Sequence, residues 1–511
     1  MTKQVVIIGA GIGGLATANL LAKAGYKVSV YEKNDQPGGR AGKLEINGFT
    51  YDTGPSWYLM PRVFEHYFGL FDRSIDKELN LSKLSPAYKV FFESHAPVVI
   101  TSDIEKDAST FDSIEPGSGE KLKNYVKKGQ EIYDLSLEHF LYTNFTSNKD
   151  LLKPEILRRA RTMAKLAMMP IDRYVGQFVT DLRLRQILEY PMVFLGSSPF
   201  SAPAIYSLMS ALDFGEGVFY PQGGLYRIID KLVEIGDELG VKYHYNSPTK
   251  QILAENGQAI GISLENGQEI KADVVISNTD LHHTETRLLA KENQSYPESY
   301  WKKLQAGPSA LLMYLGVKNK IPNLEHHNLF FIDDWKENFE SIFDSQDIPF
   351  PASLYICKPS STDKSVAPKG NENMFVLVPL PAGVNLEGGE LEQLADRYLS
   401  LIETKLSIPD LKGRLVVKEL FSPNDFKSKF NAWQNTALGP SHILRQSAMF
   451  RTANKSRKLD NLYYVGGSTV PGVGLPMCLI GAELIYKRLA GDRRGGPISR
   501  IEPLGETHDS V

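Results

Sequence analysis

Three glycines near the start of the chain stand at the spacing that binds a nucleotide pyrophosphate. Gly9, Gly11 and Gly14 form a G-x-G-x-x-G pattern, with Gly13 inside it, and Glu32 follows along the chain. Glycines at this spacing permit a tight turn and let the backbone approach the pyrophosphate closely. An acid at the position of Glu32 accepts hydrogen bonds from ribose hydroxyls and repels a 2′-phosphate. The pattern therefore predicts a dinucleotide site.

A second set of residues with the chemistry to hold a cofactor follows directly. Its members are Lys33, Gly38, Gly39, Arg40, Gly54 and Pro55. A glycine pair can bring the backbone close to a flat or anionic group, and Arg40 can pair with the charge of a pyrophosphate. The alternative is a surface turn with a solvated arginine. In the first case this loop lies over the same nucleotide.

The elements that must position these residues are readable around the glycines. Gln4–Ile8 is a short run rich in β-branched residues, and Leu15–Ala24 is a helix-forming run that Gly25 ends. Lys27–Glu32 alternates between polar and apolar residues as a second strand does. The segment is predicted to be a strand–helix–strand unit with the glycine turn between strand and helix.

Charge and hydropathy exclude several classes of protein. The 57 basic and 60 acidic residues leave a net charge of −3, which argues against a nucleic-acid binder. The N-terminus resembles no signal peptide, and no apolar run approaches the roughly 18 residues that span a bilayer. We therefore expect a protein that is soluble or bound to the membrane surface.

Cysteine and histidine usage argues against a metal centre. Cys357 and Cys478 are far apart and have no other soft ligand beside them, so we expect neither a disulfide scaffold nor a zinc site. The two histidine pairs, at 282–283 and 326–327, lack a third ligand at a usable spacing. The expectation is a metal-free protein of the reducing cytoplasm.

The cofactor motifs resemble those of the flavin-dependent amine oxidoreductase superfamily. That family combines the glycine turn, an acid after the second strand, a Gly-Gly-Arg loop and a C-terminal strand with a glycine turn, which Asn461–Thr469 resembles at Gly466 and Gly467. The resemblance implies that the cofactor is FAD. It also implies that the helix starting near Pro476 and Met477 directs its positive end at the flavin, and that Thr249 lies by the adenine.

Within the superfamily the sequence resembles the bacterial-type phytoene desaturases and related carotenoid desaturases. The stretches that carry this resemblance are Leu184–Ile187, Leu195–Ser201, Ile205–Leu208, Gly217–Gly224 and Gly466–Pro476. Two positions depart from the family pattern, Val470 where a polar residue is common and Tyr464 where an aliphatic residue is usual. The resemblance implies desaturation of a phytoene-like polyene, in which a hydride passes to the flavin and a proton is lost.

The same resemblance, joined to the local patterns, predicts the fold class and the division into domains. The expected fold is α/β, with a Rossmann-like, GR2-type FAD-binding domain interleaved with an α+β substrate domain and a helical membrane-contact region. The FAD-binding domain is expected from residues 1–110, 215–290 and 440–491, and the substrate domain from 290–440. Residues 111–214 form the helical region, and 492–511 are expected to be a flexible tail.

The helical region contains one amphipathic segment with a basic face. In Ile156–Met169 an apolar stripe includes Met163 and Ala167, and Arg158, Arg161 and Lys165 lie opposite. Such a helix fits a membrane surface, or equally an ordinary helix packed on its own domain. Glu155, at its start, is a candidate base, with a helix-stabilising carboxylate as the alternative role.

Two other functions remain open beside the desaturase, and the electron acceptor follows from the single nucleotide motif. One alternative is a flavin amine oxidase or another carotenoid-modifying oxidoreductase or isomerase. The other is a non-catalytic prenyl-lipid carrier of the same fold, as in the GDP-dissociation inhibitors. No second G-x-G-x-x-G stands between a strand and a helix. We therefore expect electrons to leave to a quinone or oxygen at the membrane surface rather than to NADP.

Overall fold

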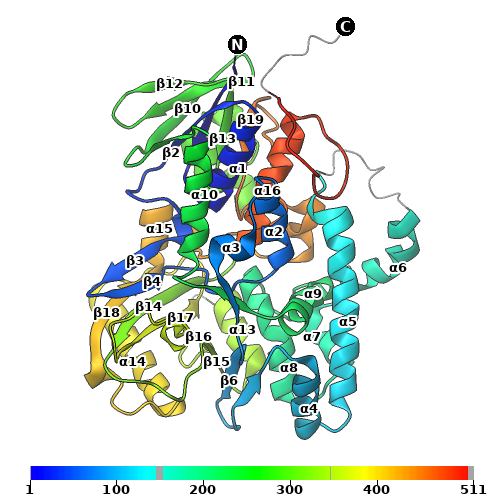
Figure 1. The fold of residues 1–511 in the computed structure, drawn as a ribbon, viewed down its shortest axis with the longest axis vertical. Coiled ribbons are helices and arrows are strands. Elements are labelled where there is room, and N and C mark those ends of the chain that lie inside the picture. Colours follow the sequence, from blue (N-terminus) through cyan, green and yellow to red (C-terminus); the bar gives the residue numbers. More distant parts are fainter. Residues whose placement is uncertain (1, 145–153, 346, 505–511) are drawn as a thin grey trace.

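The computed structural model describes the backbone of residues 2–144, 154–345 and 347–504; the side chains of residues 76, 154–158 and 160 lie outside the description. The chain forms two sheet-based parts and a helical part (Figure 1). The sheet that carries the glycine motif lies at one end of the molecule, and the second large sheet and the helical part lie side by side at the other. The expected α/β fold class is confirmed.

A five-stranded parallel sheet carries the glycine motif. Its strands are β1 (Gln4–Ile8), β2 (Lys27–Tyr31), β9 (Lys242–His244), β13 (Val274–Ser277) and β19 (Leu462–Tyr464), in the order β19-β13-β1-β2-β9. The central strands are almost entirely buried, as apolar runs in a parallel sheet require. Helices α1 (Ile12–Lys23), α10 (Tyr226–Glu238) and α16 (Leu475–Leu489) pack beside one another on this sheet. The predicted strand–helix–strand unit is present, with its helix starting at Ile12.

An antiparallel meander of three strands follows β9 in the chain. It consists of β10 (Thr249–Glu255), β11 (Gln258–Leu264) and β12 (Glu269–Lys271). Two Glu-Asn-Gly turns, at residues 255–257 and 265–267, join these strands, and Asn256 takes the positive φ of 49° that such a tight turn needs. The meander begins at Thr249, beside the end of β2.

A seven-stranded mixed sheet forms the second part. Its strands are β6 (Tyr88–Phe92), β7 (Val98–Ile100), β14 (Ser309–Val317), β15 (His327–Phe331), β16 (Leu354–Cys357), β17 (Glu372–Leu380) and β18 (Leu415–Phe421), in the order β18-β14-β17-β16-β15-β6-β7. Helix α14 (Gly388–Lys405) buries its apolar face against it. Strands β6 and β7 were expected in the nucleotide-binding domain, because they fall within residues 1–110. They join this sheet instead, since β6 pairs in parallel with β15 more than 200 residues away.

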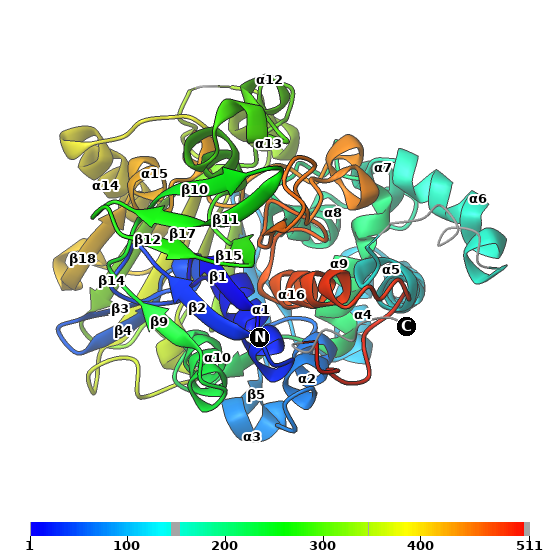
Figure 2. The same cartoon turned by 90° about the horizontal axis from the view of Figure 1, so that it is seen from above.

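Helices dominate the chain between the two parts. They are α4 (Ile104–Ile114), α5 (Ser118–Ser136), α6 (Pro154–Met168), α7 (Ile171–Val175), α8 (Leu182–Glu189) and α9 (Leu208–Ala211). In both views α6 projects away from the body of the molecule (Figures 1 and 2). None of the helices within the described residues is long and apolar enough to cross a bilayer.

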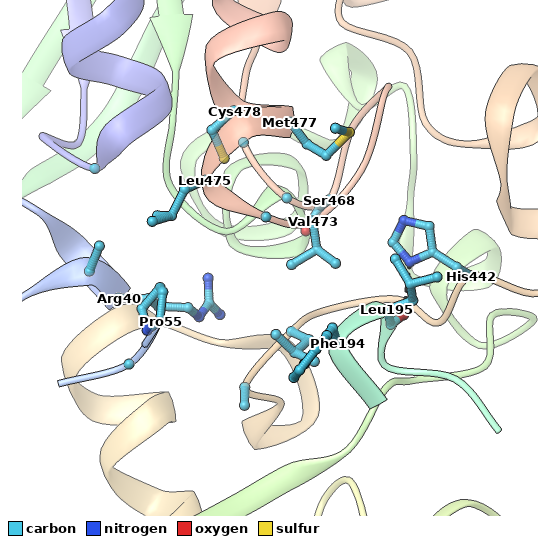
Figure 3. A pocket seen from close by; sticks show the side chains of 18 of the residues that line it. Arg40, Pro55, Phe194, Leu195, His442, Ser468, Val473, Leu475, Met477 and Cys478 are labelled. Carbon is cyan, nitrogen blue, oxygen red and sulfur yellow. Dashed lines mark hydrogen bonds between the residues drawn. The ribbon is translucent and has the colours of Figure 1, made fainter. Parts of the chain in front are cut away.

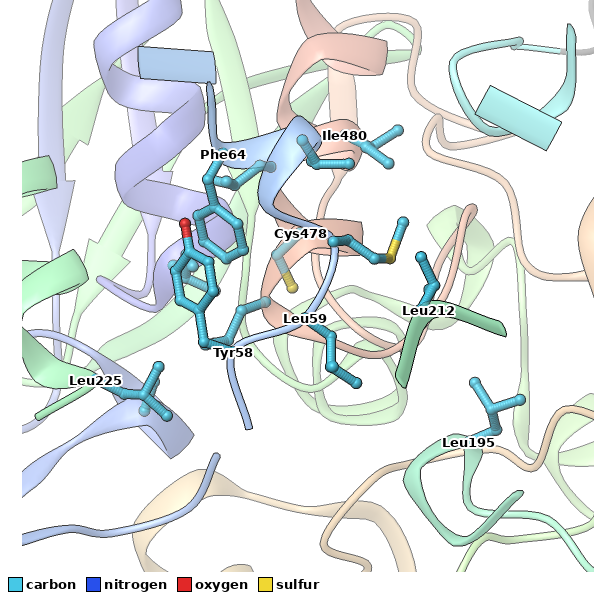
Figure 4. Close-up of a cluster of buried hydrophobic side chains, with 14 of the residues drawn as sticks. Tyr58, Leu59, Phe64, Leu195, Leu212, Leu225, Cys478 and Ile480 are labelled. Carbon is cyan, nitrogen blue, oxygen red and sulfur yellow. The ribbon is translucent and has the colours of Figure 1, made fainter. Parts of the chain in front are cut away.

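A buried cluster joins the first sheet to these helices. Residues from the α2 segment (α2 spans Pro61–Gly69) and from α16 meet in it, and the rings of Tyr58 and Phe64 stack with centroids 4.4 Å apart (Figure 4). Leu212 and Cys478 are labelled in the same cluster, from the end of α9 and the start of α16. The cluster therefore fixes the start of α16 against the helical part.

The expected flexible tail is ordered over residues 492–504. Ile498 is buried, and its backbone N–H donates to Glu483 of α16 over 2.7 Å. The N–H of Leu504 donates to the carbonyl oxygen of Ala24 over 2.8 Å. These contacts with α16 and the end of α1 join segments that are far apart in the sequence, so a local reading cannot identify them. Residues 505–511 lie outside the described residues.

Candidate functional site

A single cavity of about 1140 Å³ runs from the first sheet into the space between the second sheet and the helices. Fifteen of the predicted cofactor residues line it: Gly9, Gly11, Gly13, Glu32, Lys33, Gly38, Gly39, Arg40, Gly54, Pro55, Thr249, Gly466, Gly467, Pro476 and Met477. They come from five separated stretches of the chain. Gly14 lies behind this wall, at the base of α1.

The glycine turn leaves no room for side chains. A β-carbon on Gly14 would clash with the carbonyl oxygen of Gly9, and one on Gly11 would lie 2.6 Å from the Asn278 amide nitrogen. Both approaches are far inside the van der Waals contact distance of about 3.5 Å. Asn278 also donates from its amide to the Gly9 carbonyl over 3.4 Å. The open cradle at the N-terminus of α1 therefore depends on glycine and on Asn278.

Asn278 was missed in the sequence analysis. It follows β13 directly, and its backbone N–H donates to Ile8 over 2.8 Å. A polar residue at the carboxyl end of a parallel strand next to the glycine-motif strand is a recognisable signal, because ligands bind at that edge of such sheets. The pairing of β13 with β1, which supplies this information, is not readable from local sequence.

Glu32 is held ready to accept from a hydroxyl group. One carboxylate oxygen accepts from the Ala10 N–H over 2.8 Å, and the other accepts from the backbone N–H and the side-chain amide of Asn34, each over 2.8 Å. Each oxygen keeps further acceptor capacity. The hydroxyl of Thr249 lines the same cavity and is buried without a partner among the described residues. These two side chains fit the hydroxyl groups and ring nitrogens of a nucleoside.

The ammonium group of Lys33 is bound outside the cradle. It donates to the carbonyl oxygen of Ser428 over 2.7 Å, and burial lowers its pKa. The side chain therefore ties β2 to helix α15 (Pro423–Phe430) rather than presenting its charge to the cavity.

Arg40 lines the cavity, and one of its hydrogen-bond donors has no partner within the part of the chain that the structure describes. Its guanidinium lies 5.7 Å from the centre of the Phe430 ring, and one terminal nitrogen donates to the Thr436 carbonyl over 3.5 Å. The Nε atom is buried without a partner among the described residues. Burial lowers the pKa of Arg40, and the charge of Asp280 opposes this shift. A largely enclosed positive charge with an unpartnered donor fits a pyrophosphate better than it fits a solvated surface turn.

Gly54 is required by the same loop. A β-carbon on Gly54 would collide with the carbonyl oxygen of Arg40. The Gly54-Pro55 segment can therefore lie directly against the Gly-Gly-Arg loop only because residue 54 has no side chain. The two predicted motifs form one wall of the cavity (Figure 3).

The N-terminus of α16 opens onto the cavity beside that of α1. Gly474 precedes α16 with a φ of 125°, and Pro476 occupies the first turn, where its missing N–H costs nothing. In Figure 3 Leu475, Met477 and Cys478 surround the start of this helix. Two helix N-termini at one cavity give a positive potential and free N–H donors. This arrangement favours an anionic group and a ring that gains negative charge.

Beyond the cradle the cavity wall is apolar and aromatic. The indole of Trp57 stacks on His327 with centroids 4.1 Å apart and lies against Tyr190 and Phe194. Further lining side chains are Leu59, Met60, Phe140, Leu195, Ile205, Leu208, Met209, Leu312, Leu329, Phe331, Trp335, Phe339, Ile342, Phe375 and Leu377. This chamber suits a long hydrocarbon.

The chamber extends to α6 and to the segment 444–450. Met163 and Ala167 of the predicted apolar stripe line it, and Arg161 and Lys165 are exposed on the opposite side. Leu444, Met449 and Phe450 line the cavity and are also 42%, 45% and 60% exposed. The cavity therefore has an apolar mouth here. The candidate base Glu155 and the basic residue Arg158 lie outside the residues whose side chains the structure describes.

The histidine pair at 326–327 has a neighbour that the sequence analysis did not assign to it. Pairing of β15 with β16 sets Cys357 opposite His327, and donor atoms of His326, His327 and Cys357 lie within 4.8 Å of one another. The expectation that this pair lacks a third candidate ligand is wrong. Burial raises the pKa of Cys357, which keeps it a thiol, and Nδ1 of His327 bonds to the Tyr355 hydroxyl over 2.6 Å. Burial also lowers the pKa of both histidines, and each Nδ1 has a hydroxyl partner, whereas each Nε2 is buried without a partner among the described residues.

Comparison with known proteins gives a consistent result. The family described as flavin containing amine oxidoreductase matches residues 12–483. The chain is 38% identical to a carotenoid 3,4-desaturase of Haloarcula japonica, over 96% of this chain and 98% of that protein. It is 36% identical to a zeta-carotene-forming phytoene desaturase of Myxococcus xanthus, over 95% and 94%. A putrescine oxidase structure shares the fold, with a TM-score of 0.60 at 15% identity over 96% and 98% of the two chains.

Replacing Gly14 with alanine should abolish cofactor retention. The added β-carbon would collide with the Gly9 carbonyl and displace the start of α1, which shapes the cradle. We expect purified G14A to contain less than about a tenth of the flavin of the parent protein, since even about 1.4 kcal/mol of lost binding is tenfold. Gly389→Ala is the matched control, because a β-carbon there meets no atom within 4 Å. Equal flavin content in G14A and the parent, measured by absorbance, would contradict the cradle.

Replacing Arg40 with methionine should weaken flavin binding while the protein stays folded. Loss of a charge-assisted contact costs about 1–3 kcal/mol, or roughly 5- to 150-fold in the dissociation constant. Arg227→Met, at a half-exposed arginine outside the cavity, is the control. Fluorescence titration of the apoprotein with FAD measures both. An unchanged dissociation constant for R40M would mean that the loop serves only as a turn.

Proposed function

Because this chain belongs to the flavin containing amine oxidoreductase family, and within it to the carotenoid desaturases, we propose that it is an FAD-dependent desaturase that introduces double bonds into a phytoene-like polyene. The observation that carries the proposal is the continuity of one cavity, with a nucleotide cradle at one end and an aromatic, apolar chamber at the other. Such a cavity places a long hydrocarbon beside a redox cofactor.

Each end of the cavity has a defined task. Glu32 and Thr249 hold the adenosine part of FAD, and Arg40 with the N-terminus of α1 holds the pyrophosphate. The N-terminus of α16 stabilises the negative charge that the flavin gains on reduction. Bound FAD supplies the hydride acceptor that no side chain can provide. The chamber walls exclude water and align a saturated segment of the polyene.

The lining distinguishes this proposal from an amine oxidase and from a lipid carrier. The acidic residues that line the cavity, among those described, are Glu32, Glu265 and Asp280. All three belong to the strand-end segments of the cradle, so none is available in the chamber to pair with an amine. A carrier of prenyl lipids has no need for the glycine cradle or for the buried guanidinium of Arg40.

The mouth of the cavity supports contact with a membrane surface, where the substrate dissolves. Leu444, Met449 and Phe450 expose apolar surface at the mouth, and Met168 at the end of α6 is 73% exposed. The exposed basic residues of α6 lie on the same projecting element (Figure 2). Apolar side chains with basic residues beside them bind anionic bilayer surfaces. We assign a peripheral membrane position on the cytoplasmic side to the protein.

The electron acceptor follows from the use of the nucleotide motif. The cradle at β1 and α1 is assigned to FAD, and the mouth at 444–450 is open to a hydrophobic acceptor from the bilayer. A quinone or oxygen therefore reoxidises the cofactor, without NAD or NADP.

Expression in cells that accumulate a colourless carotene tests the proposed function. We expect new pigments with longer conjugated systems in cells that make the parent protein, and the precursor alone in cells that make G14A. Unchanged precursor in both strains, with the parent protein produced and containing flavin, would contradict the proposal.

In liposome assays, benzoquinone should sustain turnover without nicotinamide.

Reversing the charge on α6 should weaken membrane binding. Each basic residue contributes about 1 kcal/mol near an anionic surface, so the double variant Arg161→Glu, Lys165→Glu should lower partitioning into anionic vesicles by roughly tenfold or more. The control is Lys302→Glu, Lys303→Glu, at two exposed lysines that do not line the cavity. Flotation gradients measure both. Equal flotation of the α6 variant and the parent would contradict the membrane contact and mean that α6 serves only in packing.

A further inference from the structure

His442 lies in the cavity wall where the apolar chamber meets the cradle. It lines the cavity together with Leu195, and its side chain faces the segment around Val473 (Figure 3). The residue is only 3% exposed. Nothing in the local sequence marks this histidine as a functional residue.

The hydrogen bonds of His442 fix the position of its proton. Its Nδ1 atom lies 2.9 Å from the carbonyl oxygen of Leu195, which can only accept. Nδ1 therefore carries the hydrogen, and in the neutral ring Nε2 carries the lone pair. The backbone N–H of His442 donates to Ser197 over 2.7 Å, which holds the residue against the same turn. Among the described residues, Nε2 has no hydrogen-bond partner.

The surroundings keep the ring neutral. Burial lowers the pKa of His442 well below its ordinary value, and the nearby charge of Arg451 lowers it further, while the bond to Leu195 acts in the opposite direction. The guanidinium of Arg451 donates to the carbonyl oxygens of Gly467 and Gln446 over 2.5 and 3.1 Å. The rings of His442 and Tyr206 lie nearly perpendicular to each other, with centroids 5.9 Å apart.

Nε2 faces the segment that leads into α16. A β-carbon on Gly472 would collide with Nε2, so the imidazole lies directly against the backbone of that residue. Gly472 stands between Val470 and Gly474, both of which line the cavity. The imidazole therefore lies at the cofactor end of the chamber, against the segment that leads into α16, and His442 itself lines the cavity.

We propose that Nε2 of His442 is the base that takes the proton from the polyene during desaturation. The inference rests on the proposed function. Two adjacent carbons of the substrate each lose one hydrogen: one leaves as a hydride to FAD, and the other leaves as a proton to Nε2. The electron pair of the second C–H bond becomes the new C=C bond. The imidazolium then releases its proton towards the open mouth of the cavity.

A weak base is sufficient for this step. A C–H bond next to an allylic cation is strongly acidic, so a neutral imidazole accepts its proton readily. The repulsion from Arg451 that lowers the basicity also favours release of the proton after the step. Elsewhere on the cavity wall a polar pair joins Ser56 to Tyr355 over 2.7 Å, and its hydroxyl groups are far weaker bases than imidazole.

His442→Gln keeps a hydrogen-bonding side chain but removes the basic lone pair, and it provides the first test. We expect single-turnover desaturation in H442Q to slow by roughly 100-fold or more, the size typical of general-base catalysis. Flavin content, the visible spectrum and the melting temperature should match those of the parent. His95→Gln, at an exposed histidine outside the cavity, is the control. An H442Q rate within about threefold of the parent would overturn the assignment.

His442→Ala with added imidazoles distinguishes a base from a structural residue. We expect imidazole to restore desaturation in H442A, and methylimidazoles of higher pKa to restore it faster. A folded, flavin-containing H442A that recovers nothing would overturn the proposal.

If neither variant folds, the parent protein provides the measurement. Diethyl pyrocarbonate should modify His442, and bound carotene should protect it, as seen by mass spectrometry; no modification of His442 would overturn the proposal. A parent protein that holds flavin but does not desaturate would instead refute the proposed function, and the assignment of His442 with it.

Discussion

The close packing of Gly14 against the carbonyl oxygen of Gly9 is the constraint on which the site depends. This contact sets the position at which α1 begins after β1, and it keeps the N-terminus of the helix free of side chains. The strands β13 and β19 then bring Asn278 and Gly466 to the same edge, and α16 starts beside α1. A cofactor cradle results because backbone, rather than side chains, lines this edge. Arg40 supplies a buried positive charge on this wall.

The second sheet and the helices turn this cradle into a site for a hydrocarbon. Aromatic rings from several elements enclose the chamber, with Trp57 in contact with His327, Tyr190 and Phe194. The same fold occurs in a putrescine oxidase at 15% identity, so the fold alone does not determine the substrate. We infer that the apolar lining of the chamber, with the mouth of the cavity at α6 and residues 444–450, selects a polyene. His442 is one of the polar side chains on this wall, and its Nδ1 atom is fixed by the carbonyl oxygen of Leu195.

The parts of the site that could be predicted from the sequence are those whose signals are local. The glycine turn, the strand–helix–strand unit and the Gly-Gly-Arg loop are encoded within about forty residues, and the structure places them around one cavity. Asn278, His442 and the partner of His326-His327 could not be predicted, because each depends on a pairing of distant segments. Likewise β6 pairs with β15, and residues 492–504 pack on α16. The pattern of apolar residues within each segment does not predict these contacts.

An anaerobic titration of the oxidised flavoprotein with a carotene in liposomes tests the central claim most directly. The account predicts that the visible band of oxidised flavin bleaches in proportion to the double bonds formed, with no nicotinamide present. Admission of a benzoquinone should then restore the band and allow further turnovers. A flavin spectrum that stays oxidised while the carotene is bound, or double bonds that form without bleaching, would contradict it.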